Sequence, residues 1–211
     1  MAKLNRLVKG FLQEHFRLLG LVLLFFLLGA ILGGLSGNHL PLEQQQELKS
    51  FIDQNCQALI NEPFDRTRIL GQTLTENVCL AFSLWFLGLT VIGLPLVIVI
   101  IFIRGFILGF TVGFLVQQKS LQGTALILLG ILPHSLIYVP ALIVGGVLAI
   151  SFTLFLIQGR FSVTSMLWSR FLHYTWCMLG VVLVLLLSGL LEGLVVPAFL
   201  RLLVPLLGAG G

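Results

Sequence analysis

Charged residues are scarce in this sequence. Its 211 residues include only 12 Lys and Arg and 8 Asp and Glu, whereas hydrophobic residues make up 58% of the chain. Soluble domains ordinarily have about a quarter of their residues charged. One soluble core could not bury so much apolar surface, but a bilayer core of about 30 Å accepts helices of roughly 20 apolar residues. The composition therefore predicts an all-α, polytopic helical membrane protein.

Motifs of catalysis and metal binding are also missing from the sequence. No GxSxG, HExxH, P-loop or paired-carboxylate pattern occurs, and the only acids outside residues 43–76 are Glu14 and Glu192. The three cysteines lack metal-ligand spacing and predict neither a disulfide framework nor a zinc site: Cys56, Cys79 and Cys177. We therefore expect no enzymatic activity, no cofactor, no metal and no nucleic-acid partner.

Long apolar blocks are what the sequence does contain, and they predict five spans. Residues 77–116 are apolar for about twice the length of one span, with Gly93 to Pro95 near the middle, which predicts two spans joined by a tight turn. The block 124–157 is too long for one upright helix. Its Pro133 and Pro140 are both predicted to interrupt the helix, and the block is interpreted as a half-helix, a break near Pro133 and then a full span. Within a single domain over residues 1–211, the predicted spans are residues 18–35, 77–93, 94–116, 124–157 (broken) and 174–196.

Basic residues predict the orientation of these spans, because Lys and Arg in short loops stay cytoplasmic. Lys3, Arg6, Lys9 and Arg17 precede the first span, and the loop before the last span carries Arg160 and Arg170. Five spans place both groups in the cytoplasm, with the N-terminus inside and the C-terminus outside a multi-pass cell-membrane protein. Six spans would put the second group outside. The alternative for the N-terminus is a cleaved signal peptide.

Residues 37–75 form the only sizeable polar segment, which this orientation places outside the cell. Its apolar residues recur at helical spacing and predict an amphipathic helix: Leu48, Phe51, Ile52 and Leu59. The helix either lies on the bilayer or the bundle, or it docks an extracytoplasmic partner. Both interpretations stay open from the sequence.

Arg104 falls about ten residues into the third predicted span, near the middle of the membrane. A guanidinium there costs about 2.5–3.5 kcal/mol on insertion scales, so it needs a polar environment. The sequence offers Glu192, backbone carbonyls freed near Pro133, or lipid phosphates reached by snorkelling. The alternative is that the span boundaries are shifted and Arg104 ends a span on the cytoplasmic side.

Three glycines follow Arg104 at intervals of four: Gly105, Gly109 and Gly113. This spacing lets two membrane helices approach closely, either within one bundle or between the subunits of a homodimer.

His134 follows Pro133 inside an apolar block. It is predicted either to be a helix-break residue whose hydrogen bonds are made within the protein, or to act as a ligand or proton relay. Broken helices also occur in transporters, so a permease is a second hypothesis.

Four segments together resemble the stage II sporulation protein M family of endospore-forming bacteria. They are Asn77 at the start of span two, RGFILGFTVGFL in span three, ILPHSLIYVPALIVGG in span four and LLEGLVVPAFL at the end of span five. Broader relatives have PHG followed by Glu where this chain has Ser135 and Tyr138, and a Glu-Ala-Phe motif of which only Glu192 is matched. The first of these departures favours the sporulation branch.

The resemblance implies a role rather than a reaction. Family members act in engulfment, when the mother-cell membrane migrates around the forespore. They anchor the stage II sporulation proteins D and P, a lytic transglycosylase and an amidase with endopeptidase activity. The resemblance thus implies a scaffold at the sporulation septum and engulfing membrane that recruits these wall hydrolases, with residues 37–75 making part of the contact. The alternative is a permease or channel-like subunit of a transport complex.

Overall fold

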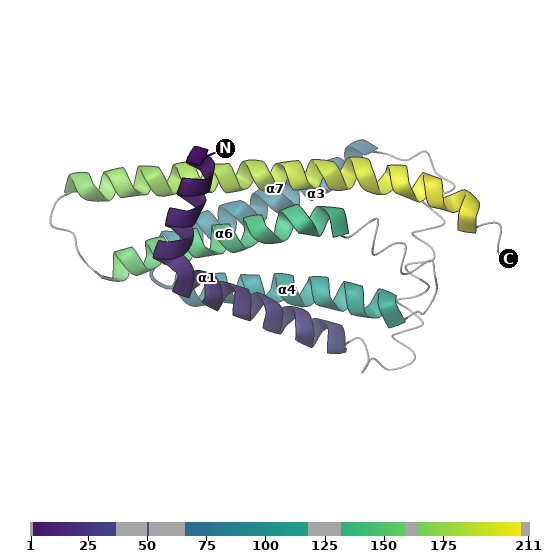
Figure 1. Cartoon of the computed structure of the whole chain (residues 1–211), viewed down its shortest axis with the longest axis horizontal. Coiled ribbons are helices and arrows are strands. Elements are labelled where there is room, and N and C mark those ends of the chain that lie inside the picture. The colour runs from purple at the N-terminus through teal and green to yellow at the C-terminus, as the bar shows by residue number, and fades with distance from the viewer. Residues whose placement is uncertain (1, 37–49, 51–65, 118–131, 159–163, 208–211) are drawn as a thin grey trace.

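Five helices make up the described part of the chain. The computed structural model describes residues 2–36, 50, 66–117, 132–158 and 164–207 (Figure 1). Within these ranges no β-strand occurs, which confirms the all-α class. The helices are α1 (Ala2–Ser36), α3 (Arg66–Gly88), α4 (Gly93–Gln117), α6 (Leu132–Ile157) and α7 (Thr164–Leu207).

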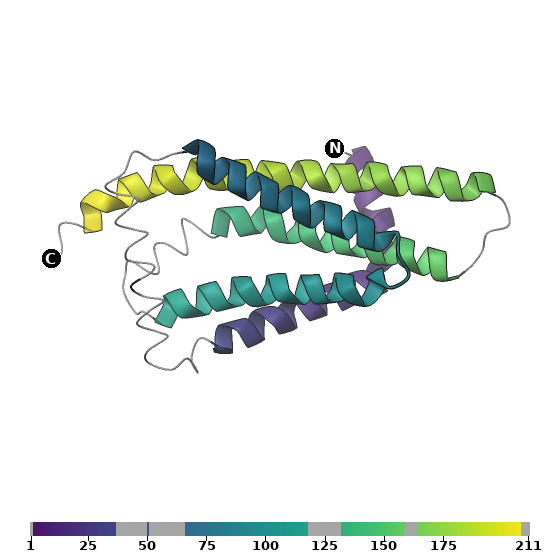
Figure 2. The same cartoon turned by 180° about the vertical axis from the view of Figure 1, so that it is seen from behind.

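Four of these helices contain a stretch long and apolar enough to cross a membrane. The stretches are Phe16–Ser36, Gly93–Phe114, His134–Ile157 and Leu167–Leu191. The fifth helix, α3, carries polar residues in its first half, yet it lies along α6 and α7 in the same bundle (Figure 2). The structure is therefore that of a polytopic helical membrane protein.

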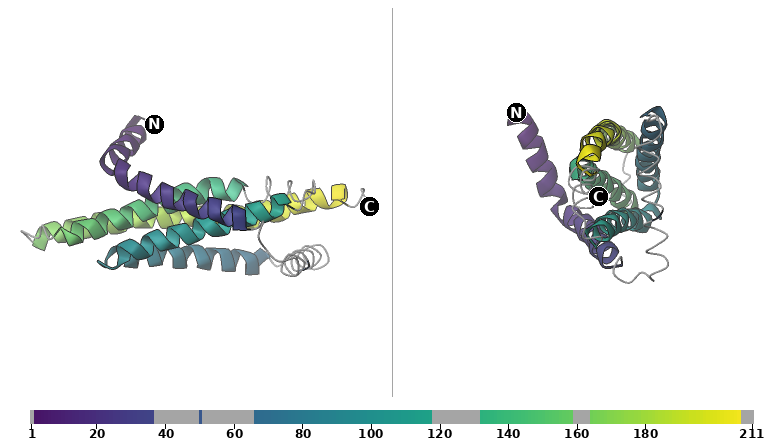
Figure 3. Two further views of the ribbon diagram at one scale, coloured as in Figure 1. Left: turned by 90° about the horizontal axis from the view of Figure 1, so that it is seen from below. Right: turned by 90° about the vertical axis from the view of Figure 1, so that its right-hand side faces the viewer.

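Helix α6 occupies the centre of the bundle. It contacts each of the other four helices, and 56% of its spanning stretch is buried, against 22% in α1 and in α4. Its Gly145 and Gly146 face Val181 of α7 and Ile101 of α4, so neighbours on two sides come close to the α6 backbone. Helices α4 and α7 lie on opposite sides of α6 (Figures 1 and 3).

The helices alternate in direction, which gives the bundle two ends. The hairpin end holds the turn between α3 and α4 and the gap between α6 and α7 (Figure 1). The C-terminal end holds the last residues of α1, α4 and α7 and the first residues of α3 and α6. The first part of α1 turns away from the bundle near the hairpin end (Figure 3).

The turn between α3 and α4 lies earlier than the sequence predicts. Residues 89–92 make it, and the Gly93 amide donates to the Thr90 carbonyl at 3.1 Å. Gly93 is the first residue of α4, where a Cβ would collide with the carbonyl oxygen of Leu87. Pro95 follows in the first helical turn, where its missing N–H costs no hydrogen bond. Gly93 to Pro95 therefore start a helix rather than form the turn.

Helix α6 begins at Leu132, so Pro133 lies in its first turn. The predicted half-helix before the break falls on residues 124–131, which are outside the described residues. Pro140 is inside α6, and the helix continues past it to Ile157. The prediction of a second interruption at Pro140 is therefore wrong, because the loss of one backbone donor is tolerated where neighbouring helices hold the segment.

The last helix is longer than the span predicted for it. Helix α7 runs without interruption for 44 residues, from Thr164 to Leu207. The predicted span, residues 174–196, lies within this helix, but the predicted loop through Arg170 is helical from Thr164 onward. Apolar length marks only the part inside the hydrocarbon, whereas backbone hydrogen bonding carries the helix on into polar surroundings. Helix α3 likewise begins at Arg66, before the apolar run that starts at Asn77.

Candidate functional site

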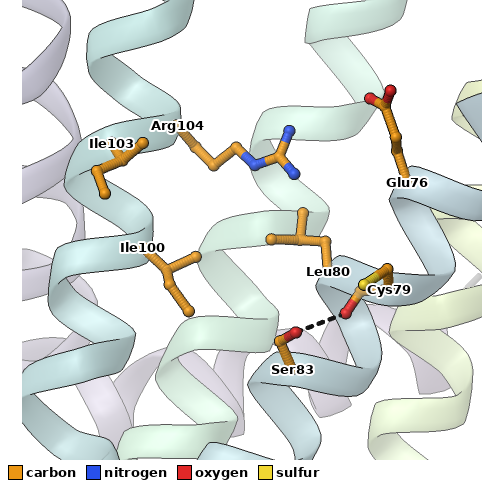
Figure 4. A pocket seen from close by; sticks show the side chains of 7 residues that line it. All are labelled: Glu76, Cys79, Leu80, Ser83, Ile100, Ile103 and Arg104. Atoms are coloured by element: carbon orange, nitrogen blue, oxygen red, sulfur yellow. Dashed lines mark hydrogen bonds between the residues drawn. The ribbon is translucent and has the colours of Figure 1, made fainter.

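A groove between α3 and α4 carries charged side chains on the outer surface of the described bundle. The two helices diverge from their turn, although α6 contacts both of them (Figure 2). The groove has a volume of about 350 Å³. Its lining combines two charged, two small polar and three aliphatic side chains: Glu76, Arg104, Cys79, Ser83, Leu80, Ile100 and Ile103 (Figure 4).

Arg104 extends from α4 across this groove towards Glu76 on α3 (Figure 4). It lies near the middle of the spanning stretch Gly93–Phe114, so it does not end a span. It is half-buried, and no ion pair joins it to an acid among the described residues. Glu76 is exposed and accepts a hydrogen bond from Gln72 Nε2 at 3.2 Å. The groove thus presents two opposite charges that face one another without contact.

The hairpin register explains why these charges lie at the same depth. Glu76 precedes Gly88, the last residue of α3, by nearly as many positions as Arg104 follows Gly93, the first residue of α4. Residues at equal distances from the turn of an antiparallel helix pair lie side by side, because each helix rises by about 1.5 Å per residue. Glu76 does not stand out in the sequence because this residue precedes the apolar run. Counting outward from the turn would have found it.

A polar stripe on α3 continues from Glu76. Gln72, Glu76, Cys79 and Ser83 recur at helical spacing on one face. The first three are exposed and Ser83 is partly exposed. Ser83 Oγ donates to the carbonyl of Cys79 at 2.7 Å, which satisfies it within its own helix. This polar stripe borders exposed aromatic residues such as Phe82, so polar atoms face the same surroundings as apolar ones.

A second set of polar residues is buried and ties three helices together. Asn77 Nδ2 donates to the carbonyl oxygen of Leu185 on α7 at 3.1 Å. Ser188 Oγ lies 2.9 Å from Nδ1 of His134 on α6. Asn77 and Ser188 are both buried, and the His134 ring stacks on Tyr138. His134 therefore lies in the first turn of α6 and fastens that helix to α7.

The C-terminus of α3 is capped by hydroxyl groups from two other helices. Thr153 Oγ1 of α6 donates to the carbonyl of Gly88 at 3.0 Å, and the Tyr174 hydroxyl of α7 donates to that of Trp85 at 3.0 Å. The last carbonyls of a helix have no partner within it. These caps cannot be predicted from local sequence, since they join residues far apart along the chain.

The glycine face of α4 packs against α1 of the same chain. A Cβ at Gly109 would meet the backbone oxygen of Ala30, and one at Gly105 or Gly113 would meet the oxygen of Phe26 or Gly34. The contact is reciprocal, because Gly29 and Gly33 of α1 face the oxygens of Phe102 and Phe106. This face is therefore occupied within the bundle.

The other residues predicted to have a role do not line the groove. Glu192 belongs to α7, on the opposite side of α6 from Arg104, and its side chain is outside the described residues (Figure 1). The side chain of Pro133 is outside them as well. So is the predicted docking set of Leu48, Phe51, Ile52 and Leu59. Of the intramembrane candidates, only Arg104 contributes to the groove.

No group of three or more His, Cys, Asp or Glu among the described residues could hold a metal ion. His173 and Cys177 lie 3.7 Å apart on α7, one helical turn from each other, and do not line the groove. The groove therefore holds two charges and two small polar groups beside the spanning stretch of α4.

The family model of stage II sporulation protein M matches residues 22–197, from within α1 to within α7. No curated protein and no solved structure matches the chain. Because the match covers most of the chain, including all of α3, α4 and α6, the chain belongs to the stage II sporulation protein M family and is a sporulation-related membrane protein.

Proposed function

We propose that this protein is a membrane anchor that recruits and positions peptidoglycan hydrolases during forespore engulfment. Its partners would be the stage II sporulation proteins D and P at the septum and the engulfing membrane. Family membership is the observation that carries this proposal. The chain itself would catalyse no reaction.

The distribution of chain length between the two ends supports the proposal. At the C-terminal end, residues 37–65 separate α1 from α3, and residues 118–131 separate α4 from α6. At the hairpin end, only residues 89–92 join α3 to α4, and only residues 158–163 separate α6 from α7. The C-terminal end therefore has much more chain with which to contact a partner.

Positive charges near the hairpin end support an orientation of the bundle in the membrane. Arg17 lies at the start of the spanning stretch Phe16–Ser36, whose other end is at the C-terminal end of the bundle. Arg170 lies in the first two turns of α7, which begins at the hairpin end, and Arg160 falls between α6 and α7 in the sequence. Since Lys and Arg in short loops stay cytoplasmic, the hairpin end would face the cytoplasm. The C-terminal end, with residues 37–65, would then face the cell wall on which the hydrolases act.

Co-purification tests the recruitment. Replacing Phe51 with Glu and Ile52 with Lys should leave the protein in the membrane but reduce recovery of stage II sporulation protein P with it by roughly tenfold, the effect of losing about 1.4 kcal/mol. Phe161→Lys, between α6 and α7 in the sequence, is the matched control and should leave recovery unchanged. Undiminished recovery with the first variant would count against this surface.

A transport pathway receives less support from the described residues. Their buried polar side chains form one set around Asn77 and another around Thr153. Apolar residues fill the core between these sets, including Leu84, Leu142 and Ile150. A permease would need polar groups along a continuous path, so we do not propose transport.

A further inference from the structure

The groove between α3 and α4 is costly to leave in contact with lipid. An arginine at the middle of a spanning helix costs about 2.5–3.5 kcal/mol, and an acid is penalised similarly. Here Arg104 lies halfway along α4, and Glu76 is exposed on α3 at the same depth. The polar stripe adds Gln72 and Cys79 to the exposed surface. A protein surface that covers the groove would remove these costs.

We infer that two copies of this chain associate through the groove, with Glu76 of each copy paired to Arg104 of the other. This inference does not rest on hydrolase recruitment, and either proposal can fail without the other. It concerns the surface formed by α3 and α4, which the glycine face of α4 does not share.

Charge complementarity selects a second copy as the occupant. A two-fold axis along the membrane normal keeps every residue at its own depth. Since Glu76 and Arg104 lie at one depth on neighbouring helices, the axis brings each acid opposite the base of the other copy. An isologous interface of this kind is self-complementary. A partner helix with a single charge would leave one of the two groove charges unpaired.

The other lining residues suit close association of helices. Cys79 and Ser83 are small and lie on the polar stripe, one turn and two turns from Glu76. Small residues let membrane helices approach until their backbones are in van der Waals contact. Leu80, Ile100 and Ile103 supply aliphatic surface around them. The two grooves would thus form a four-helix contact with the ion pairs inside it.

Charge reversal in two differently tagged copies tests this arrangement. Arg104→Glu alone and Glu76→Arg alone should each lower self-association in nanodiscs or mild detergent by at least about tenfold, since each sets like charges against one another. Co-expression of the two variants should restore a mixed pair that co-purifies through both tags. Restoration can occur only between copies, because neither variant chain carries an acid and a base in its own groove.

Controls keep the test specific to the groove. Arg201→Glu, near the end of α7, should neither impair self-association nor restore it when co-expressed with Glu76→Arg. In a background of Cys56→Ser and Cys177→Ser, a short bismaleimide should join two copies through Cys79. In a background that keeps only Cys177, it should not.

Three results would overturn the inference. The first is a monomeric mass for the unaltered protein in nanodiscs. The second is failure of the mixed pair to form while the double variant R104E/E76R regains the unaltered protein's thermal stability, which would place the ion pair within one chain. The third is a mixed pair that forms equally well with Arg201→Glu in place of Arg104→Glu.

Discussion

The two sides of α4 differ in how closely another helix approaches. On one side, α1 comes so near that added side chains at Gly105, Gly109 or Gly113 would collide with its backbone oxygens. On the other side, α3 leaves a groove of about 350 Å³ that includes Arg104. Yet α3 is joined to α4 by a short turn, whereas α1 is separated from α4 by all of α3. Proximity along the chain therefore does not decide which helices pack most closely.

Side-chain size and polarity account for the difference. Apolar side chains gain little free energy by moving from lipid into a helix contact. Helices in a membrane therefore associate through van der Waals packing and hydrogen bonds. Glycines on both α1 and α4 let the two backbones come into contact. Arg104 instead projects into the space beside α3 (Figure 4). Helix α3 is held from its other face, by hydrogen bonds to α6 and α7.

The largest loss of stability is expected where α4 packs against α1. Gly109→Leu should lower the free energy of unfolding by about 3 kcal/mol, because backbone atoms of Ala30 cannot move aside and the helices must separate. Thermal unfolding in detergent measures the loss. Gly180→Leu is the matched control, since nothing lies within 4 Å of a Cβ there. Equal melting temperatures and unchanged oligomeric mass for the two variants would contradict the packing described.

An intermediate loss of stability is expected where hydrogen bonds hold α3 against α7. Asn77→Ala removes the hydrogen bond to the Leu185 carbonyl and should cost about 1 kcal/mol, as interhelical hydrogen bonds in membranes do. The same unfolding measurement detects it. Thr111→Ala, whose hydroxyl bonds to Ile107 within its own helix, should change stability less. If both variants behaved alike, Asn77 would not fasten α3 to α7.

The smallest loss of stability in the monomer is expected at the groove between α3 and α4. Arg104→Leu should lower the unfolding free energy of the monomer by no more than about 0.5 kcal/mol, because Arg104 forms no ion pair with a described residue. The measurement is made at a detergent-to-protein ratio that keeps the chain monomeric. A loss as large as that of Gly109→Leu would show that Arg104 holds α3 and α4 together.

Much of the fold could be predicted from apolar length and spacing. The all-α membrane class, the hairpin of α3 and α4 and the start of α6 near Pro133 all follow from the sequence. The ends of α7 do not, because hydropathy reports contact with lipid and not where backbone hydrogen bonding stops. The glycine spacing predicts a close helix contact but cannot identify α1 as the partner, since any helix with small residues would satisfy it.

The candidate site is only half visible in the sequence. Arg104 stands out because a charge within an apolar run is conspicuous, whereas Glu76 merges with the polar segment before span two. Their common depth depends on where the turn falls, and a shift of the turn by two residues moves each helix by about 3 Å along its neighbour.

The sequence by itself determined that the chain enters the membrane, because too few polar groups exist to keep so much apolar surface in water. It also placed a charge and a glycine face on one helix. Only the tertiary structure decided that the glycines are covered by α1 and that Arg104 faces Glu76. Helix partners are chosen by the fit of whole surfaces, and that fit depends on the rotation and tilt of each helix, which no single segment of sequence specifies.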